Sequence, residues 1–528
     1  MLYFIPSWYH NDSFREQEQY WFRRRLVTEF DDTVKQIQLF NRNNISKYKI
    51  LLLSFAPNFR HFLHRQSVFH APYWSCFDAI QEITRLSVDT LSFHDLLWPE
   101  HIEFMYTPFC VIANLNHKKF ADIHFAEDGN MIEVIMYKDN TVTRKNTYDD
   151  RGFLSSTIVY ENGKPLYEQY LNVKGIWKIC HFFNDNHIEV NPKQAHYLIH
   201  GQEIKYKKLT YGSMGELITE VFTSYIEMNT DEDDIFCLAM HPLHYELLDD
   251  VLYNRKKILS FYQQRLEASE NLKLKEIMEN ARYIIVDSRY AIPKIKEHLD
   301  KDVPIIDITP FDTRVDFGIS QQLTVQNILV PVDRMTSQQF EQLVLQFVSY
   351  FEMNETARVH FFTRKAQWNV KDIILEETKK VLEKHNLDIR IARKEDDNKA
   401  ENDLDHERSV PIRFYVDQCV DELAISKTIR LQRLMVDVTD HMDLYLIISC
   451  ISAGIPMILH SKTQYMEDHK NGLMIQSIDE IPSSLSYYLD GLNNWNKALV
   501  ASYEIGKKYN TKSLISKWKE VMIQVDKD

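Results

Sequence analysis

The pattern of apolar residues late in the chain predicts a strand, a helix and two further strands. Leu434–Val438 and Pro456–His460 are apolar runs with the length of buried strands, and Leu473–Ile475 is a third. Asp443–Ala453, between the first two runs, has the length and apolar content of a helix. A strand–helix–strand unit of this kind builds a parallel sheet, whose ligands bind outside the carboxyl ends of the strands.

Strands and helices alternate in the same way in two longer blocks, which predict two Rossmann-like α/β domains. The further elements of the second block are strands Asn327–Val332 and Ala357–Phe362 and helices Ser337–Phe351 and Val370–His385. The expected elements of the first block are strand Leu2–Ile5, a long helix over Ser13–Asn41, and strands Ile50–Phe55, Asp234–Ala239, Tyr283–Asp287 and Pro304–Ile308. Thr309–Gly318 is the expected crossing between the two blocks.

Between residues 101 and 202 the apolar period changes to two, which is the period of a strand. Turn signals such as Asn162-Gly163 recur at a spacing of about 11 residues and predict an antiparallel meander of about six or more strands. Four tyrosines are expected to pair across these strands and stabilise the sheet: Tyr137, Tyr148, Tyr160 and Tyr170. The alternative is that exposed aromatic side chains of the sheet bind a polypeptide or sugar rings.

A chain of 528 residues is too long for one hydrophobic core, and the order of elements predicts its division. Residues 1–100 and 206–310 form the first Rossmann-like domain, residues 101–205 form the inserted antiparallel sheet, and residues 311–528 form the second Rossmann-like domain. The stretch from Arg393 to Arg408 is charged, has almost no apolar residue and predicts a solvated loop.

Composition excludes several classes of protein. The formal net charge of -14 and the pI near 5.9 argue against a general binder of nucleic acid or of anionic membrane. No apolar run approaches the ~20 residues that span a bilayer, and the start of the chain has no signal-peptide pattern, so we expect a cytosolic protein. The six cysteines include no CxxC pair and are expected to be buried, reduced thiols.

Glycine is scarce, which bears on phosphate binding. The chain has 12 glycines, where average usage predicts about 37, and the first of them is Gly129. Since glycine lets backbone approach a phosphate, the N-terminal domain is expected to lack a glycine-rich phosphate loop.

The turn Ala453-Gly454-Ile455-Pro456 resembles the donor-sugar half of retaining two-domain (GT-B) glycosyltransferases. In such enzymes two glutamates at a fixed spacing hold the nucleotide ribose and orient the sugar. The corresponding positions here, counted back from Gly454, are Ser449, His441 with its neighbour Asp440, and, in place of the loop glycines, Met442 and Leu444. A serine supplies no carboxylate, and bulky side chains keep backbone away from a phosphate.

Arg334 follows the strand Asn327–Val332, where such enzymes place an arginine that neutralises the diphosphate leaving group. The usual lysine partner is absent, because residues 335–341 contain no basic side chain. The alternative for Arg334 is a surface or interdomain contact. Arg334, Asp440, His441 and Ser449 are therefore interpreted as vestigial donor-site positions, and no catalytic or cofactor-binding residue is predicted.

Other catalytic and metal-binding patterns are weaker. The chain has no GxSxG nucleophile elbow and no GxxxxGK[ST] phosphate loop. Two histidine pairs have the spacing of zinc ligands without an evident third ligand, so no metal site is predicted: His61 with His64, and His241 with His244. Two further clusters have a simpler explanation. Asp437 is expected inside a strand while Asp440 and Asp443 enter and cap a helix, and Ser213 with Glu216 forms a capping box.

Four segments resemble one family over the whole chain. They are residues 2–10 (LYFIPSWYH), 64–81 (HRQSVFHAPYWSCFDAIQ), 309–323 (TPFDTRVDFGISQQL) and 438–456 (VTDHMDLYLIISCISAGIP). These segments resemble the first accessory secretion proteins of the streptococcal and staphylococcal accessory Sec system. The resemblance implies an α/β, GT-B-like fold, in which two Rossmann-like domains face a cleft and the N-terminal half carries an inserted antiparallel extended β-sheet domain.

The resemblance also implies partners and a place of action. The expected partners are the second and third accessory secretion proteins and a glycosylated serine-rich-repeat adhesin, with the accessory SecA motor as a further candidate. The protein would act in the cytosol and meet the inner face of the membrane through the export machinery. No cofactor and no nucleic acid is implied.

Residues and resemblance together favour a non-catalytic component that binds the adhesin and hands it over for export. The first alternative is an active glycosyltransferase that modifies the adhesin through a divergent donor site formed by Arg334, Asp440 and His441. The second alternative is a lectin-like module that acts alone.

Overall fold

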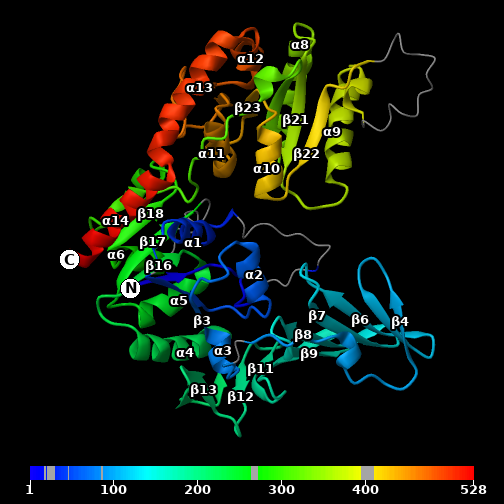
Figure 1. Ribbon diagram of the computed structural model, residues 1–528, viewed down its shortest axis with the longest axis vertical. Coiled ribbons are helices and arrows are strands. Elements are labelled where there is room, and N and C mark those ends of the chain that lie inside the picture. Colours follow the sequence, from blue (N-terminus) through cyan, green and yellow to red (C-terminus); the bar gives the residue numbers. More distant parts are fainter. Residues whose placement is uncertain are drawn as a thin grey trace.

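The computed structural model describes residues 1–16, 20, 30–45, 47–84, 87–262, 272–393 and 410–527. Two α/β domains lie one above the other, and an antiparallel sheet extends sideways from the lower one (Figure 1). This arrangement confirms the predicted pair of parallel sheets and the antiparallel insertion in the N-terminal half. The predicted solvated loop between Arg393 and Arg408 lies outside the described residues, apart from Arg393 itself.

Domain I, the lower α/β domain, is built on a seven-stranded parallel sheet in the order β19-β18-β17-β16-β1-β2-β3. The strands are β1 (Leu2–Ile5), β2 (Tyr48–Leu52), β3 (Tyr73–Ser75), β16 (Ile235–Ala239), β17 (Lys256–Phe261), β18 (Tyr283–Val286) and β19 (Ile305–Asp307). In β1, Tyr3 and Ile5 enter one apolar cluster and Leu2 and Phe4 enter another. Both faces of the sheet are therefore buried, as expected for a parallel sheet.

The helices of domain I are α1 (Asp32–Arg42), α2 (Phe59–Arg65), α3 (Cys76–Ile80), α4 (Met214–Asn229), α5 (Pro242–Val251), α6 (Leu272–Glu279) and α7 (Ala291–Lys296). The predicted helix over Ser13–Asn41 is wrong at its start, because residues 13–16 form a turn and a bridge to Phe55. Helix α1 begins at Asp32, where the Asp31 carboxylate accepts the backbone N–H of Thr33 at 2.9 Å. Most of residues 17–29 lies outside the described part of the chain.

The insertion is a ten-stranded antiparallel sheet in the order β15-β12-β11-β10-β9-β8-β7-β6-β5-β4. Its strands are β4 (Ile102–Tyr106), β5 (Val111–Leu115), β6 (Lys118–Phe125), β7 (Met131–Lys138), β8 (Thr141–Asp149), β9 (Phe153–Glu161), β10 (Lys164–Leu171), β11 (Trp177–Phe182), β12 (Ile188–Val190) and β15 (Thr210–Tyr211). Asp139 and Asn140 both have positive φ, which matches the twist of a two-residue hairpin turn between β7 and β8. Strands β13 (His196–Ile199) and β14 (Gln202–Lys205) form a separate ribbon.

The predicted pairing of tyrosines across the insertion is wrong. Tyr137 lies opposite Val142, Tyr148 opposite Leu154, and Tyr160 opposite Pro165. Each of these tyrosines lies near the turn that follows its strand, so the next tyrosine along the chain lies at the opposite end of the neighbouring strand. Tyr170 instead packs on Phe55 and Phe77 of domain I, with ring centroids 5.0 and 5.3 Å apart, and anchors the insertion to that domain.

Domain II, the upper α/β domain, has a six-stranded parallel sheet in the order β22-β21-β20-β23-β24-β25. Its strands are β20 (Gln326–Pro331), β21 (Ala357–Thr363), β22 (Phe414–Gln418), β23 (Leu434–Asp437), β24 (Met457–Leu459) and β25 (Gly472–Met474). Its helices are α8 (Ser337–Phe351), α9 (Val370–Lys384), α10 (Glu422–Ile429), α11 (Leu444–Ala453), α12 (Ile481–Leu489) and α13 (Leu492–Gly506).

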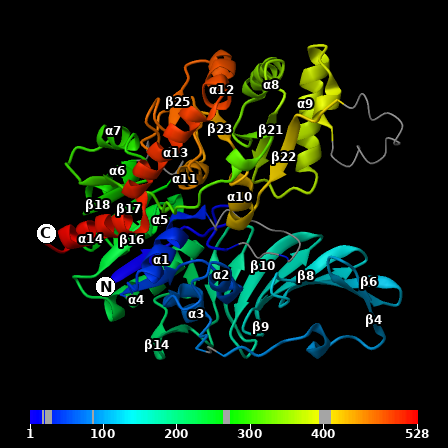
Figure 2. The same cartoon turned by 45° about the horizontal axis from the view of Figure 1, so that its top comes forward.

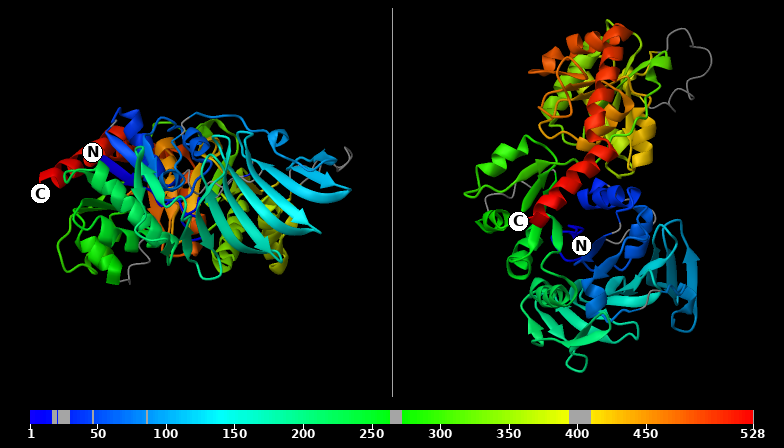
Figure 3. Two further views of the ribbon diagram at one scale, coloured as in Figure 1. Left: turned by 90° about the horizontal axis from the view of Figure 1, so that it is seen from below. Right: turned by 60° about the vertical axis from the view of Figure 1, so that its left-hand side comes forward.

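The last helix, α14 (Thr511–Lys527), leaves domain II and runs down beside domain I (Figure 3, right). Its Trp518 side chain is buried and meets Phe40 of α1 edge to face, with ring centroids 5.4 Å apart. The chain therefore crosses between the domains twice, through residues 309–318 and again before α14. Besides these two crossings, α10 of domain II reaches α1 of domain I, where Lys35 pairs with Glu422.

Candidate functional site

The carboxyl ends of the two parallel sheets meet in the cleft between the domains. The Tyr465 hydroxyl, which follows β24 of domain II, donates a hydrogen bond of 2.6 Å to the carbonyl of Asp287, which follows β18 of domain I. Next to it, the Gln464 side chain accepts the backbone N–H of Arg289 at 2.6 Å. Because ligands of parallel sheets bind at such carboxyl ends, this cleft is the candidate site.

The loops that follow the domain II strands are hydrogen-bonded to one another. Asp333, after β20, accepts the hydroxyl of Thr363 at 2.5 Å and the backbone N–H of Arg364 at 2.7 Å. The guanidinium of Arg334 donates to the carbonyl oxygens of His441 and Met442 at 3.1 and 3.2 Å. Two of the positions predicted as vestigial, Arg334 and His441, are thus brought together, and Arg334 holds the loop after β23.

Arg364, after β21, contacts side chains of both domains. Its guanidinium pairs with the Asp443 carboxylate at 2.9 Å, and Asp443 in turn caps α11 by accepting the backbone N–H of Leu446. This confirms the capping role predicted for Asp443. The same guanidinium lies 3.9 Å from the ring centroid of Phe30 and 5.4 Å from that of Tyr445. Cation and rings are in contact range for a cation–π interaction.

Aromatic side chains continue this packing into domain I. Phe30 and Phe311 each meet Tyr445 edge to face, with ring centroids 4.8 and 5.1 Å apart. Phe311 in turn meets Tyr262 at 5.9 Å. The space outside the strand ends, where a parallel sheet binds its ligand, is therefore occupied at this point by side chains of the chain itself.

The structure confirms the prediction that Asp437 lies in a strand: it is the last residue of β23 and is buried. Its carboxylate accepts the backbone N–H and the hydroxyl of Thr439 at 2.9 and 2.6 Å. Burial raises the pKa of Asp437 to about 6, and the two hydrogen bonds oppose that shift. Asp440 follows on an exposed turn.

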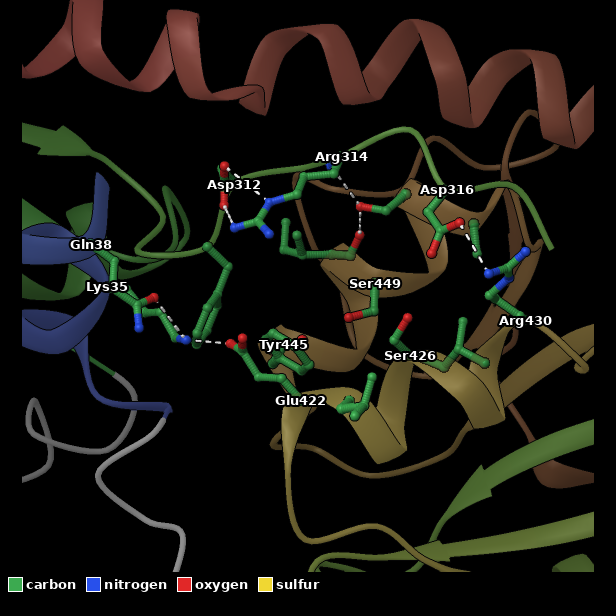
Figure 4. A pocket seen from close by; sticks show the side chains of 16 residues that line it. Lys35, Gln38, Asp312, Arg314, Asp316, Glu422, Ser426, Arg430, Tyr445 and Ser449 are labelled. Carbon is green, nitrogen blue, oxygen red and sulfur yellow. Dashed lines mark hydrogen bonds and ion pairs between the residues drawn. The ribbon is translucent and has the colours of Figure 1, made fainter. Parts of the chain in front are cut away.

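Ser449 lies apart from the other three predicted positions, in a cavity of about 380 Å³. Helices α10 and α11 and the crossing segment of residues 311–316 line this cavity together with α1 of domain I (Figure 4). Neither Arg334, Asp440 nor His441 lines it. The structure therefore does not join the four predicted positions into one site.

Ion pairs surround this cavity, and the pair of Lys35 with Glu422 connects the domains. Lys35 of α1 pairs with Glu422 of α10, and the Lys35 side chain is almost fully buried. Arg430 pairs with Asp316 at 3.7 Å, and Arg314 pairs with Asp312 at 3.2 Å (Figure 4). The Arg314 guanidinium is among the charges that hold the pKa of the Asp312 carboxyl below its usual value against the effect of burial. Each of these cations already has an anionic partner from the chain.

Sequence reasoning missed Arg364, Phe30, Lys35 and Glu422. One signal was available for Arg364. Like Arg334, it comes soon after a buried strand, so the sequence could have predicted both arginines at the same edge of the sheet. The partnership of Phe30 and Lys35 with domain II had no signal, because it depends on how the two domains are placed.

The two histidine pairs have different environments. His61 faces Asp128 at 3.4 Å, while His64 is exposed. The Tyr9 hydroxyl is hydrogen-bonded to the His244 ring at 2.8 Å, and burial raises the pKa of Tyr9 well above its usual value. Within the described ranges, no group of three or more His, Cys, Asp or Glu side chains could hold a metal ion.

The comparisons with known proteins agree with this architecture. The model of the family of first accessory Sec system proteins, the first of the Asp proteins, matches residues 1–525. The curated first accessory Sec system protein of Streptococcus gordonii is 32% identical over 538 residues, which is 98% of each chain. Its counterpart from Staphylococcus aureus is 28% identical over 536 residues, or 99% of each chain.

Solved structures give the same result. A chain of the complex of accessory secretory proteins 1, 2 and 3 from Streptococcus pneumoniae has a TM-score of 0.78 and 29% identity, and the match covers 100% of both chains. A chain of the Gap123 glycosylation-associated complex from Streptococcus agalactiae has a TM-score of 0.79 and 27% identity over 99% of this chain and 100% of that one. The pneumococcal O-GlcNAc transferase GtfA, solved with UDP and GlcNAc, has a TM-score of 0.69 at 12% identity over 100% of this chain and 99% of that one, a likeness of fold alone.

Two facing parallel-sheet domains with an antiparallel insertion, together with these likenesses, define a protein of the GT-B glycosyltransferase-like fold. Within that class, the chain belongs to the family of first accessory Sec system proteins, and it is a component of accessory secretion. None of the helices in the described part of the chain is both long enough and apolar enough to span a bilayer.

Proposed function

We propose that the chain works without catalysis, as a cytosolic component of a complex with the second and third accessory secretion proteins. In this proposal the complex binds a glycosylated serine-rich-repeat adhesin and hands it to the accessory SecA motor for export. The partners are suggested by the complexes in which the similar chains from S. pneumoniae and S. agalactiae were solved. The adhesin and the motor come from the family resemblance.

The packing of Arg364 in the cleft is the observation that carries the non-catalytic part. A donor nucleotide needs open space and unpaired cations at the strand ends, because its diphosphate is a dianion when it leaves. Here Arg364 is paired with Asp443 and stacked on Phe30, and Arg334 is bound to two loop carbonyl oxygens. Both arginines would have to leave these contacts before they could neutralise a diphosphate.

Calorimetry with nucleotide sugars tests this part. We expect no heat of binding from UDP-GlcNAc or UDP-glucose with the purified chain or with the complex. Binding in the micromolar range that disappears in Arg334→Ala would show a working donor site and would support the alternative, an active glycosyltransferase with a divergent site.

Reconstitution tests the partner and substrate part. The chain is co-expressed with the second and third accessory secretion proteins, and the purified complex is offered serine-rich repeats with and without glycosylation. We expect a stable three-protein complex that retains the glycosylated repeats better than the unmodified ones. Equal retention of both forms would contradict adhesin recognition through its sugars, and equal binding by the isolated chain would favour a lectin-like module that acts alone.

A further inference from the structure

The outer edge of the inserted sheet has unpaired backbone groups. The sheet ends at β4, and no strand of the described chain pairs with its outer side. At the hairpin between β4 and β5, the backbone N–H of Thr107 donates to the carbonyl of Cys110 at 3.1 Å. Along an antiparallel ladder, hydrogen-bonded residue pairs alternate with pairs that are not hydrogen-bonded. Met105 and Glu103, two and four residues before Thr107, therefore also direct their backbone N–H and C=O groups toward β5. The N–H and C=O groups of Ile102, Phe104 and Tyr106 therefore point outward.

The side chains at this edge are apolar and exposed. Met105 is 50% exposed and Tyr106 is 67% exposed, and as neighbours in a strand they lie on opposite faces of the sheet. Phe109, in the adjoining turn, is 58% exposed. Edge strands are usually protected from pairing by lysine, proline or a bulge. Strand β4 has none of these, and Glu103 is its one charged residue.

The edge is held rigidly in position. The Phe104 ring packs between Phe93 and Trp98, with centroid distances of 5.0 and 5.5 Å. Trp98 is fixed in turn by its indole N–H, which donates to the carbonyl of Phe93 at 2.6 Å. In Figures 1 and 2 β4 lies at the end of the insertion farthest from the α/β domains, where a partner can reach it.

Charge and polarity select among the possible occupants. Pairing with a second copy of this chain, centred on Phe104, would place each Glu103 carboxylate against Met105 of the other copy, and each copy carries a net charge of -14. A polar, serine-rich strand would leave Met105 and Tyr106 without apolar contacts. A strand with apolar side chains on both faces and a basic residue beside Glu103 complements this edge.

We propose that the free edge of β4 binds an extended strand of this kind from a partner protein, which becomes the eleventh strand of the sheet. The inference rests on the proposed function, because the partner is one of the other two accessory secretion proteins of the complex. Backbone hydrogen bonds at Ile102, Phe104 and Tyr106 give affinity, and Glu103, Met105 and Tyr106 give specificity.

Hydrogen exchange in the reconstituted complex tests the proposal. The amides of Ile102, Phe104 and Tyr106 are expected to exchange at least about tenfold more slowly in the complex than in the chain alone. Tyr106→Pro removes one outward N–H while leaving the ladder to β5 intact, and Glu103→Lys reverses the charge. Each change is expected to weaken assembly about tenfold. The matched control Glu161→Lys makes the same charge reversal at an exposed position of β9, away from the β4 edge, and is expected to weaken assembly less than about threefold.

The outcomes separate this inference from the proposed function. If the complex forms while the three amides exchange as in the free chain, the inference is overturned and the proposed function stands. If no complex forms, the proposed function is contradicted, and the inference that rests on it is overturned as well. If sedimentation shows a dimer of this chain alone that Tyr106→Pro dissociates, the occupant is a second copy and the inference is overturned. Glu103→Lys changes an exposed side chain, so it remains informative if the proline variant does not fold.

Discussion

Replacing Arg364 by alanine is the most direct test of the closed cleft. The change removes a guanidinium that joins the N-terminus of α11 to Phe30 of domain I, and it leaves the backbone of both segments in place. Asp443 keeps its capping bond to Leu446 but loses its ionic partner.

The expected cost follows from two contacts. A cation this close to an aromatic face, largely out of water, contributes about 1–2 kcal/mol. The side chains of Arg364 and Asp443 are 20% and 19% exposed, so their pair is partly screened, and we assign it about 1–2 kcal/mol rather than the value of a fully buried pair. Together the two contacts contribute about 3 kcal/mol, which corresponds to roughly a 100-fold change in an opening equilibrium.

Native-state hydrogen exchange measures that equilibrium locally, which is preferable to global unfolding of a chain with several domains. In Arg364→Ala the amide of Leu446 is expected to exchange roughly 100-fold faster. The control is Arg390→Ala, which breaks an exposed pair with Asp388 and should change the same amide less than about threefold. A change below about threefold in Arg364→Ala as well would refute the claim that Arg364 holds the cleft closed.

Three further changes test other parts of the structure. Burial raises the pKa of Asp437 to about 6, so the folded state binds the carboxyl proton more tightly than the unfolded chain does. The free energy of unfolding should therefore fall by about 2–3 kcal/mol as the pH rises from about 4 to about 6. Urea titrations of Asp437→Asn should lack that fall. Gly454 ends α11 with a φ of 70°, and an added Cβ would lie 2.9 Å from Leu499 Cγ, so Gly454→Ala should cost about 1–3 kcal/mol, measured as a lower denaturant midpoint. Trp518→Ala should cost about 3–5 kcal/mol in the same assay if α14 completes the core of domain I, whereas a cost below about 1 kcal/mol would contradict that packing.

Local signals explain how far the sequence predicted the fold. The predicted strand Leu434–Val438 and helix Asp443–Ala453 correspond to β23 and α11, because Asp443 caps the helix and Gly454 ends it in the left-handed conformation. The insertion was recognisable from its two-residue turns. The long helix predicted from Ser13 was wrong at residues 13–16, and the capping residue of α1 is Asp31.

Contacts between distant segments limited the prediction of the site. The sequence marked single positions, Arg334, Asp440, His441 and Ser449, by counting along a motif. The structure brings two of them together and places Ser449 in a separate cavity. The contact between Arg364, Phe30 and Tyr445 joins three segments that are far apart in sequence, and its existence depends on the angle between the domains.

The loop that leads into α11 contains no glycine and packs on the sheet below it. At the start of α11, where a donor loop needs glycine, Leu444 is buried in the apolar cluster beneath the cleft and Met442 packs against it. Side chains at these positions hold the loop against the sheet, and the bound loop presents Asp443 to Arg364. We infer that the interactions which a nucleotide would make with the loop are here made between the two domains. In this way Arg364 and Tyr445 of domain II are joined to Phe30 of domain I across the cleft.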